Sequence, residues 1–382
     1  MPLRTYAAGR QVYEFKRYYT LRYIPDGFLN LSAFGITQKI CLYLFINLLY
    51  NIMFNLIKNF PQQLLHAVEI GEKAVLNGKF EHPVTNVVVC GLGGSGIGGD
   101  VLSELLRNEL GVPVTVNKGY SLPASVNSST LLILSSYSGN TEETIACARA
   151  AVKKKIPATC VTSGGKLGEL ALKHNWDSIE IPSGFPPRCC LGYSVTQLFF
   201  ILHHHGLIND DFKASLIRSA SFMEGEQKKM QEETEYLAAR ILKKSVIVYA
   251  EDKYQSVALR LKQQINENAK SHCWLNVFPE LNHNELVGWS KANEHLAVLV
   301  LRTGDENPRN TLRVNFTENV LHKISQPFHE IHAKGHDAYE KHFYLIHFGD
   351  WLSYHLCIMQ GYDPFDIDIL IALKEHMSSI SE

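Results

Sequence analysis

The stretch LSSYSGNTEET, residues 134–144, joins an apolar run to a helical run and so decides the fold of this part of the chain. The run before it, residues 130–134, is typical of a buried strand, and residues 141–154 have the pattern of a helix. Small hydroxyl residues and one glycine therefore lie where the carboxyl end of a strand meets the N-terminus of a helix. The unpaired N–H groups and the positive dipole end of a helix N-terminus favour a phosphate group there.

Three hydroxyl side chains in this stretch fit a phosphate monoester. Ser136, Ser138 and Thr141 can each donate a hydrogen bond without adding bulk, and Gly139 permits a sharp turn. The stretch has no Lys or Arg, which suits a sugar phosphate better than a triphosphate. The alternative is an N-cap by Asn140 or Thr141, but capping accounts for only one hydroxyl. We therefore expect a phosphate site.

Strand-like and helix-like segments alternate from Met53 onward, which is typical of parallel sheets with helices on both faces. A charged helical stretch at residues 210–243 separates two sets of strands whose elements follow in the same order, which suggests duplication. The predicted strands are residues 86–90, 112–117, 130–134, 157–162, 178–181, 245–250, 274–278, 295–302 and 327–332.

The composition excludes several classes of protein. The chain has 382 residues, 46% of them hydrophobic, which is enough for two ordinary domains. A net charge of −1 argues against a nucleic-acid partner. The eight cysteines form no C-x-x-C pair and lie mostly in apolar runs, which indicates buried thiols in a reducing compartment rather than disulfides or zinc ligands. We expect a cytoplasmic protein.

The N-terminal segment differs from the rest. Residues 40–57 are strongly apolar, but Asn47, Asn51 and Asn55 recur every four residues and place a polar stripe on one helical face, which weakens a membrane-spanning interpretation. An ordinary amphipathic pattern begins at Met53. We expect residues 1–52 to be an N-terminal extension outside the core, and we expect no membrane partner.

A glycine-rich run follows the first predicted strand. Residues 91–100 read GLGGSGIGGD and fit the dinucleotide pattern G-x-G-x-x-G, with the next helix expected from about Gly98. A dinucleotide site also needs an acidic residue at the end of the second strand, but residues 114–119 read VTVNKG. The run can instead bring backbone close to a small anion, with Ser95 adding a hydroxyl. Close packing of helix on strand is the structural alternative.

A series of motifs resembles the bifunctional phosphoglucose/phosphomannose isomerase family, whose members have two sugar isomerase (SIS) domains. The motifs are GLGGSG at 91–96, SYSGNTEET at 136–144, PR at 187–188, LGY at 191–193, NENAK at 266–270, LNHNE at 281–285, GDWLS at 349–353, DP at 363–364 and LK at 373–374. The resemblance covers residues 53–382. It implies an α/β fold with SIS domains at 53–215 and 216–382, the second with C-terminal helices. Each would be a doubly wound, mainly parallel five-stranded sheet flanked by helices.

The resemblance also implies an activity. Family members interconvert an aldose 6-phosphate with fructose 6-phosphate through a cis-enediol, without metal or cofactor, in a homodimer whose interface contains the active site. The aldose would be glucose 6-phosphate and also mannose 6-phosphate. Tolerance of mannose is associated with a threonine near the C-terminus and glucose specificity with a glutamine, and residues 363–374 contain neither. The substrate phosphate would be held by Gly94, Ser95, Ser136, Ser138 and Thr141.

Four further residues receive chemical roles from the resemblance. Glu267 would be the base, since this isomerisation needs one carboxylate that reaches both carbons. His283 and Lys374 would assist ring opening, for which a histidine suits the working pH. Arg188, held by two preceding prolines, would stabilise the enediolate. By local sequence alone Glu267 and Lys374 are also consistent with solvated helix residues.

Other readings remain. The triple histidine at residues 203–205 and the histidines at 329, 332 and 336 do not match H-E-x-x-H, and we interpret them as structural. A non-catalytic SIS regulator that binds a sugar phosphate is one rival function, although such regulators usually carry a basic DNA-binding helix. An isomerase of another sugar phosphate on the same scaffold is the second.

Overall fold

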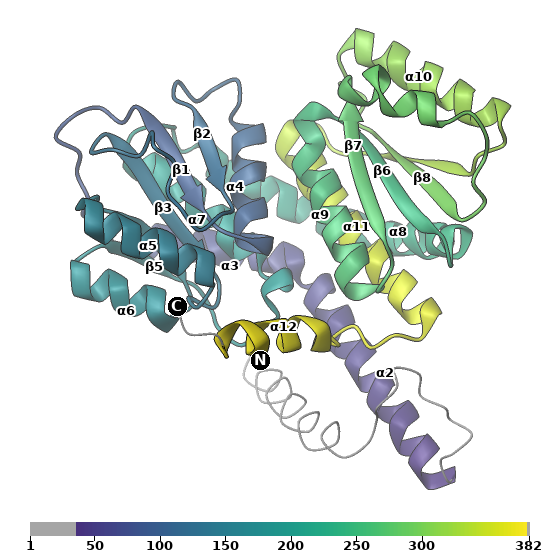
Figure 1. Ribbon diagram of the computed structural model, residues 1–382, viewed down its shortest axis with the longest axis horizontal. Helices are drawn as coiled ribbons and strands as arrows, with labels where there is room; N and C mark the ends of the chain where they lie inside the picture. The colour runs from purple at the N-terminus through teal and green to yellow at the C-terminus, as the bar shows by residue number, and fades with distance from the viewer. Residues whose placement is uncertain (1–35, 380–382) are drawn as a thin grey trace.

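The computed structural model describes residues 36–379, which form two parallel sheets with helices between and outside them (Figure 1). The first sheet has five strands in the order β2-β1-β3-β4-β5, and every neighbouring pair is parallel. Its strands are β1 (Asn86–Cys90), β2 (Val114–Asn117), β3 (Thr130–Ser136), β4 (Thr159–Thr162) and β5 (Asp177–Glu180). Its helices are α4 (Gly93–Leu105), α5 (Glu142–Lys154), α6 (Gly165–His174) and α7 (Leu191–His204).

The second sheet has four strands in the order β7-β6-β8-β9, again all parallel. Its strands are β6 (Ser245–Glu251), β7 (Cys273–Phe278), β8 (Leu296–Arg302) and β9 (Phe328–His332). Its helices are α9 (Gln255–Asn268), α10 (Pro308–Lys323) and α11 (Ala338–Gln360), and the last helix is α12 (Asp368–Ser378). Short 3-10 turns are η2 (Pro187–Cys189), η3 (Asp252–Tyr254), η4 (Glu280–His283) and η5 (Glu285–Gly288).

The two sheets share one topology. The order β2-β1-β3-β4 corresponds strand for strand to β7-β6-β8-β9, and α4 and α9 follow the equivalent strands β1 and β6. This confirms the predicted doubly wound α/β class. The expectation of five strands in the second sheet is wrong, because only four strands pair in it among the described residues, as the strand pattern of that half had indicated.

The main core lies between the two sheets. One continuous cluster of buried apolar side chains joins the inner faces of both sheets to the helices between them, including α4, α7, α9 and α11. Two smaller clusters lie on the outer faces, under α5 and α6 on the first sheet and under α10 on the second. Burial on both faces explains why the central strands β1, β3, β6 and β8 read as apolar runs without alternation.

A long helix, α2 (Ile36–Lys58), leads into α3 (Phe60–Lys73). Near its C-terminus Leu49, Met53 and Ile57 are buried, and Phe54 packs edge-on against Trp351 of α11 with ring centroids 5.0 Å apart. The predicted end of the N-terminal extension, residue 52, lies within this helix, and residues 1–35 lie outside the described residues. No helix in residues 36–379 is both long and apolar enough to span a membrane.

Another long helix, α8 (Asp211–Ile241), connects the two halves and packs against α3 and α11. The predicted domain boundary between residues 215 and 216 lies inside it, and the division into two domains there stays a prediction.

The glycine-rich run is not a loop, which corrects the expected helix start near Gly98. Helix α4 begins at Gly93, so most of the glycines lie in its first turns. They permit close packing rather than flexibility. A Cβ at Gly96 would lie 2.6 Å from the Gly91 carbonyl oxygen, and one at Gly99 would lie 3.0 Å from the Val116 side chain. Because glycine has a low helix propensity, the local sequence does not indicate a helix start at Gly93, and tertiary packing overrides that propensity.

Candidate active site

The predicted phosphate residues flank the point at which the strand order of the first sheet reverses. From β1 the chain passes to β2 on one side, and β3 lies on the other. Ligands of open α/β sheets bind at such a switch point, outside the carboxyl ends of the strands. The first turn of α4, with Gly94 and Ser95, follows β1, and residues 136–141 follow β3. The structure therefore brings the two predicted phosphate segments to one edge.

The turn after β3 keeps its hydroxyl groups near one another. The Ser136 and Thr141 hydroxyl oxygens are 2.9 Å apart, and Ser136 is buried. Thr141 is the N-cap residue of α5, but its side chain makes no capping hydrogen bond. The capping alternative therefore does not account for Thr141. Ser138 is exposed, and its Oγ accepts a hydrogen bond from the Asn140 N–H at 3.2 Å.

Gly139 makes this turn possible. Its φ is +66°, in the left-handed region, and a Cβ there would lie only 1.8 Å from the carbonyl oxygen of Gly164. Any larger residue would therefore both strain the backbone and collide with the neighbouring loop. The Asn140 side chain accepts from the Lys166 N–H at 3.2 Å, which holds the turn against the start of α6.

A buried arginine meets the predicted base. Arg188 Nη1 lies 2.8 Å from Glu267 Oε1, and the side chains are 6% and 30% exposed, respectively. Arg188 Nε also donates to Asn268 Oδ1 at 2.8 Å, and Nη2 donates to the Pro364 carbonyl at 2.5 Å. The guanidinium is thus fixed on three sides, while the Glu267 carboxylate keeps partial access to solvent. A residue of α9 and one before α7, far apart in sequence, form one charged pair.

A second layer of buried polar groups holds Arg188 in place. Arg260 Nη2 donates to the Arg188 carbonyl oxygen at 2.6 Å and pairs with Asp350 at 3.1 Å. Gln264 Nε2 donates to Asp350 Oδ1 at 2.7 Å. Burial raises the pKa of Asp350, and the charge and hydrogen bonds of Arg260 oppose that shift. This network positions the backbone on either side of the Arg188 and Glu267 pair.

The charged pair is contiguous with the phosphate segments. A Cβ at Gly94 would lie 3.2 Å from the Pro187 carbonyl oxygen, so the first turn of α4 touches the residue before Arg188. Turn η2 packs on α4, and α4 packs on α9. The glycine turn, the arginine and the carboxylate are therefore contiguous between the two halves of the chain.

His283 does not join this cluster within one chain, and, among the described residues, the Lys374 side chain makes no hydrogen bond or ion pair with Arg188 or Glu267. His283 is exposed in η4, beyond the carboxyl end of β7, whereas Glu267 precedes the start of β7. The six residues of β7 span about 20 Å, so the two side chains lie at opposite edges of the second sheet. Lys374 is exposed on α12. This helix begins four residues after Pro364, whose carbonyl oxygen accepts a hydrogen bond from Arg188.

Sequence reasoning missed several of the supporting residues. Asn268, Asp350 and Ser353 lie inside motifs noted above, so a signal for them was present. Asn268 Nδ2 donates to Ser353 Oγ at 3.0 Å. Arg260 gave no local signal, because an arginine within a helix is usually solvated. Lys270 was quoted only as part of a motif, yet its Nζ donates to the Glu267 carbonyl at 2.5 Å and burial lowers its pKa.

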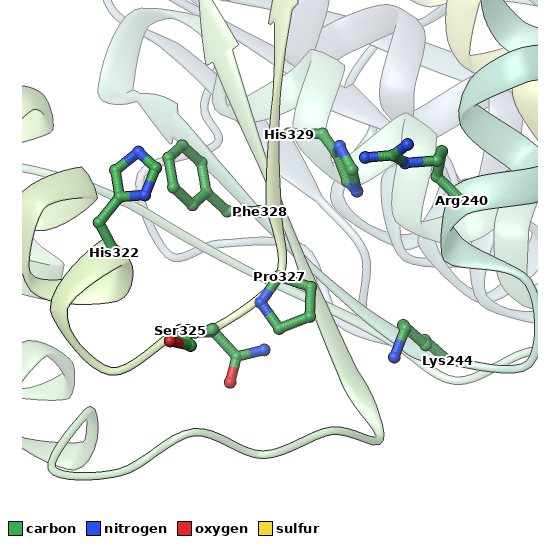
Figure 2. Close-up of a pocket in the computed structure, with 8 residues that line it drawn as sticks. Arg240, Lys244, His322, Ser325, Pro327, Phe328 and His329 are labelled. Carbon is green, nitrogen blue, oxygen red and sulfur yellow. The ribbon is translucent and has the colours of Figure 1, made fainter.

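An open hollow of about 340 Å³ lies elsewhere, between the ends of α8 and α10 and the start of β9 (Figure 2). Basic side chains line it, including Arg240, Lys244, His322 and His329. Arg240 and Lys244 lie at and just after the C-terminal end of α8, where cations complement the helix dipole, which gives these two residues a structural explanation. No residue of the predicted site lines it. Within the described part of the chain, His, Cys, Asp and Glu side chains form no group of three that could hold a metal ion.

Comparisons with known proteins agree with the fold. Residues 230–377 match the family model described as the bacterial phospho-glucose isomerase C-terminal SIS domain. The C-terminal domain of glucosamine-fructose-6-phosphate aminotransferase from Francisella tularensis has a similar fold, with a TM-score of 0.62 and 16% sequence identity over 82% of this chain and 97% of that one.

Curated relatives are considerably more similar in sequence. The bifunctional phosphoglucose/phosphomannose isomerase of Caldicellulosiruptor bescii is 36% identical over 340 residues, which cover 86% of this chain and all of that protein. The enzyme of the same name from Aquifex aeolicus is 33% identical over 77% of this chain and 91% of its own length. By these matches over nearly the whole of both relatives, the chain belongs to the bifunctional phosphoglucose/phosphomannose isomerase family.

Proposed function

We propose that this protein interconverts glucose 6-phosphate, and also mannose 6-phosphate, with fructose 6-phosphate through a cis-enediol intermediate. The observation that carries the proposal is the 2.8 Å pair of Arg188 and Glu267 beside the glycine turn of α4. It combines a carboxylate, a fixed cation and a helix N-terminus suited to phosphate in one place.

Glu267 is the base that moves the proton. Its carboxylate takes the proton from C2 of the open-chain aldose, and the electrons of that C–H bond form the C1–C2 double bond while the C1 oxygen gains a proton. The same carboxyl group then returns its proton to C1, and loss of the proton on the C2 hydroxyl leaves the ketone of fructose 6-phosphate. Arg188 stabilises the negative charge of the enediolate, which needs a cation already held in place.

The phosphate of the substrate binds at the carboxyl edge of the first sheet. The N–H groups of the first turn of α4 and the hydroxyl groups of Ser95, Ser136, Ser138 and Thr141 supply the donors. None of these is charged, so the affinity for the phosphate rests on several neutral hydrogen bonds and the helix dipole.

His283 acts from a second copy of the chain. Its position at the far edge of the second sheet from Glu267 supports a homodimer in which each subunit completes the site of the other. Lys374 assists ring opening from α12, which follows Pro364, a direct partner of Arg188. The free thiols of the described cysteines, most of them buried, support a cytoplasmic location.

A coupled assay tests the activity. With fructose 6-phosphate as substrate, glucose 6-phosphate dehydrogenase and NADP, we expect steady formation of NADPH. Mannose 6-phosphate in place of fructose 6-phosphate gives the same signal if both aldoses are accepted. No signal with either substrate would remove the proposed activity and favour a sugar-phosphate regulator or an isomerase with another substrate.

Mixing two inactive variants tests the shared site. Random exchange of Glu267→Gln and His283→Ala subunits makes about half of the dimers mixed, and each mixed dimer has one intact site, so about one quarter of wild-type activity should return. No recovery in a mixture whose subunit exchange is verified would place His283 in the site of its own chain or outside the site.

A further inference from the structure

Helices α4 and α9 occupy equivalent positions in the two halves of the chain and pack side by side (Figure 1). They run antiparallel, because the start of α4 lies beside the end of α9 and the end of α4 lies beside the start of α9. Each helix has a glutamate as its penultimate residue, Glu104 in α4 and Glu267 in α9. The two glutamates therefore lie at opposite ends of one helix pair.

Contacts enclose the Glu104 carboxylate near the C-terminus of α4. Its Oε1 accepts from the Ser256 N–H at 2.6 Å, and its Oε2 accepts from the Ser256 hydroxyl. His342 Nε2 lies 3.3 Å from the same Oε2. The side chains of Glu104 and His342 are 12% and 3% exposed, and Ser256 is buried. The Glu104 carboxylate thus caps the first turn of α9 from the other half of the chain.

His342 makes further contacts around this carboxylate. Its Nδ1 donates to the Ala338 carbonyl at 2.8 Å, and its Nε2 also lies 3.2 Å from the Lys253 carbonyl. Both ring nitrogens therefore face oxygen acceptors. The ring stacks on Tyr254 with centroids 4.2 Å apart, which prevents it from rotating away. Burial raises the pKa of Glu104, and the bonds from His342 and Ser256 oppose that shift.

The spacing along the two helices matches. Gly94 and Glu104 are ten residues apart on α4, or about 15 Å, and Ser256 and Glu267 are eleven residues apart on α9, or about 17 Å. When Glu104 holds Ser256, Glu267 is therefore brought level with the glycine turn. A slide of α9 by one residue would move the Glu267 carboxylate by about 1.5 Å relative to the phosphate segments.

We propose that Glu104, with Ser256 and His342, is a positioning clamp that sets the register of α9 on α4 and thereby the distance from the Glu267 carboxylate to the bound sugar phosphate. This proposal rests on the proposed role of Glu267 as the base. Glu104 touches neither substrate nor the reacting atoms. Glu104 and Glu267 occupy equivalent positions in α4 and α9. One carboxylate holds the helix pair together, and the other takes part in the chemistry.

Kinetics and crystal structures of Glu104→Ala and Glu104→Gln test the clamp. In Glu104→Ala we expect kcat to fall by about tenfold or more, because small errors of placement are costly, while KM changes by less than about threefold. In Glu104→Gln, whose amide can still accept from the Ser256 N–H, we expect most of the turnover to remain. Arg107→Ala is the matched control, because its exposed 3.1 Å pair with Asp252 joins the same helix ends and should matter little.

Crystal structures of the variants distinguish a failure of the clamp from a failure of the assignment of Glu267 as the base. In the Glu104→Ala crystal structure we expect α9 to be displaced along α4 and the Arg188 to Glu267 contact to lengthen beyond 3.5 Å. An unshifted α9, or a kcat equal to wild type at a temperature where the variant is folded, would overturn the clamp. If instead α9 shifts but Glu267→Gln keeps its turnover, the clamp stands as a register device and the base assignment fails.

Discussion

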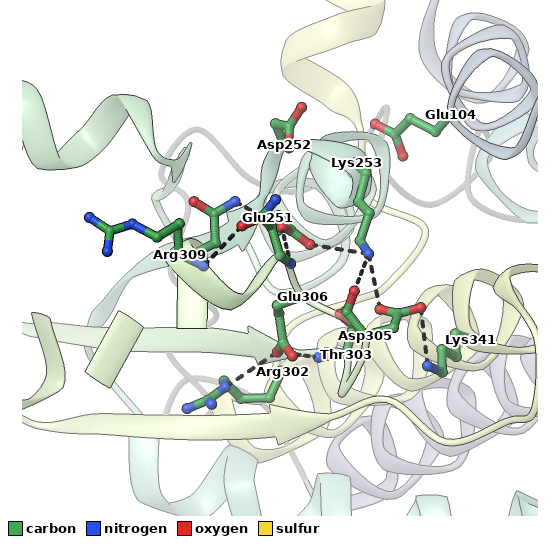
Figure 3. Close-up of polar contacts among 12 residues, drawn as sticks. Glu104, Glu251, Asp252, Lys253, Arg302, Thr303, Asp305, Glu306, Arg309 and Lys341 are labelled. Carbon is green, nitrogen blue, oxygen red and sulfur yellow. Dashed lines mark hydrogen bonds and ion pairs between the residues drawn. The ribbon is translucent and has the colours of Figure 1, made fainter. Parts of the chain in front are cut away.

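The carboxyl edges of the two sheets have the same topology but opposite chemistry. In the first sheet β1 and β3 end in small neutral residues: the glycine turn of α4 and the Ser136 to Thr141 turn. In the second sheet the equivalent strands β6 and β8 end in charged residues, with Glu251 closing β6 and Asp305 and Glu306 following β8. Figure 3 shows how these carboxylates and Lys253 fill that edge.

The charges of the second edge satisfy one another. Glu251 is buried, and its Oε1 accepts from the Asn307 N–H and from Asn310 Nδ2, both at 2.8 Å. Lys253 Nζ lies 3.3 Å from Glu251 Oε2 and 3.2 Å from Asp305 Oδ1. A phosphate placed here would meet several carboxylates whose charges Lys253, Lys341 and Arg302 already pair, so repulsion disfavours it. The shared strand order thus provides two equivalent edges, and their side chains determine which edge can bind an anion.

The largest effect is expected where the first edge meets Glu267. Glu267→Gln keeps an acceptor for Arg188 but removes the base, so we expect kcat to fall by about 10² to 10⁴-fold while KM changes by less than about threefold. The coupled isomerase assay measures both. Glutamine preserves size and hydrogen bonding, so a variant that retains turnover excludes Glu267 as the base.

The second-largest effect is expected on KM, at the proposed phosphate site of the first edge. Ser136→Ala and Thr141→Val each remove a hydroxyl from the proposed phosphate site, and we expect KM to rise about tenfold or more for each because bonds to a charged acceptor are worth about 1.5 to 3 kcal/mol. Inorganic phosphate should inhibit these variants correspondingly less. Thr303→Val, just after β8, is the matched change in the second edge and should leave KM unaltered. An equal rise in KM there would contradict the comparison.

A smaller effect concerns stability alone. Glu251→Ala leaves the Asn310 amide and the Asn307 N–H without their acceptor, which should lower the free energy of unfolding by about 1 to 3 kcal/mol. Thermal melting should detect this loss, while kcat and KM at 25 °C stay close to wild type. A variant with normal stability but impaired turnover would mean that the second edge takes part in catalysis.

The smallest expected effect depends on pH. Arg302, the last residue of β8, lies within 3.4 Å of carboxylate oxygens of Glu306, Glu318 and Glu330. Burial and the neighbouring Glu330 raise the pKa of Glu318 to about 7. Because the folded pKa lies above the unfolded one, the stabilising contribution is complete below the unfolded value of 4.5 and is lost as pH rises through about 7.

Glu318→Gln should therefore melt a few degrees higher than wild type at pH 8 and show no such gain at pH 4 to 5. Melting curves of both proteins across this range measure the difference. A difference that does not change with pH would show that Glu318 does not titrate in this cluster.

Much of the fold follows from local sequence patterns. All nine predicted strands are present, with ends that differ by a few residues. The central strands are the clearest, because apolar runs bounded by turn residues are typical of a buried parallel strand. The start of α4 was misplaced, since glycine disfavours helices and only the close approach of Gly91 and Val116 explains its use there. The motif residues Arg188 and Glu267 could be named from the sequence, but their contact could not.

By itself, the sequence determined which segments become strands, where a turn of small hydroxyl residues precedes a helix, and which family the motifs resemble. Only the tertiary structure decided which helix ends meet. Three features depend on how the two sheets pack around a shared helix layer. They are the contact of Glu104 with Ser256, the contact of Arg188 with Glu267, and the separation of His283 from Glu267. Residue periodicity encodes which face of an element is buried, but carries no information on which distant element will cover it.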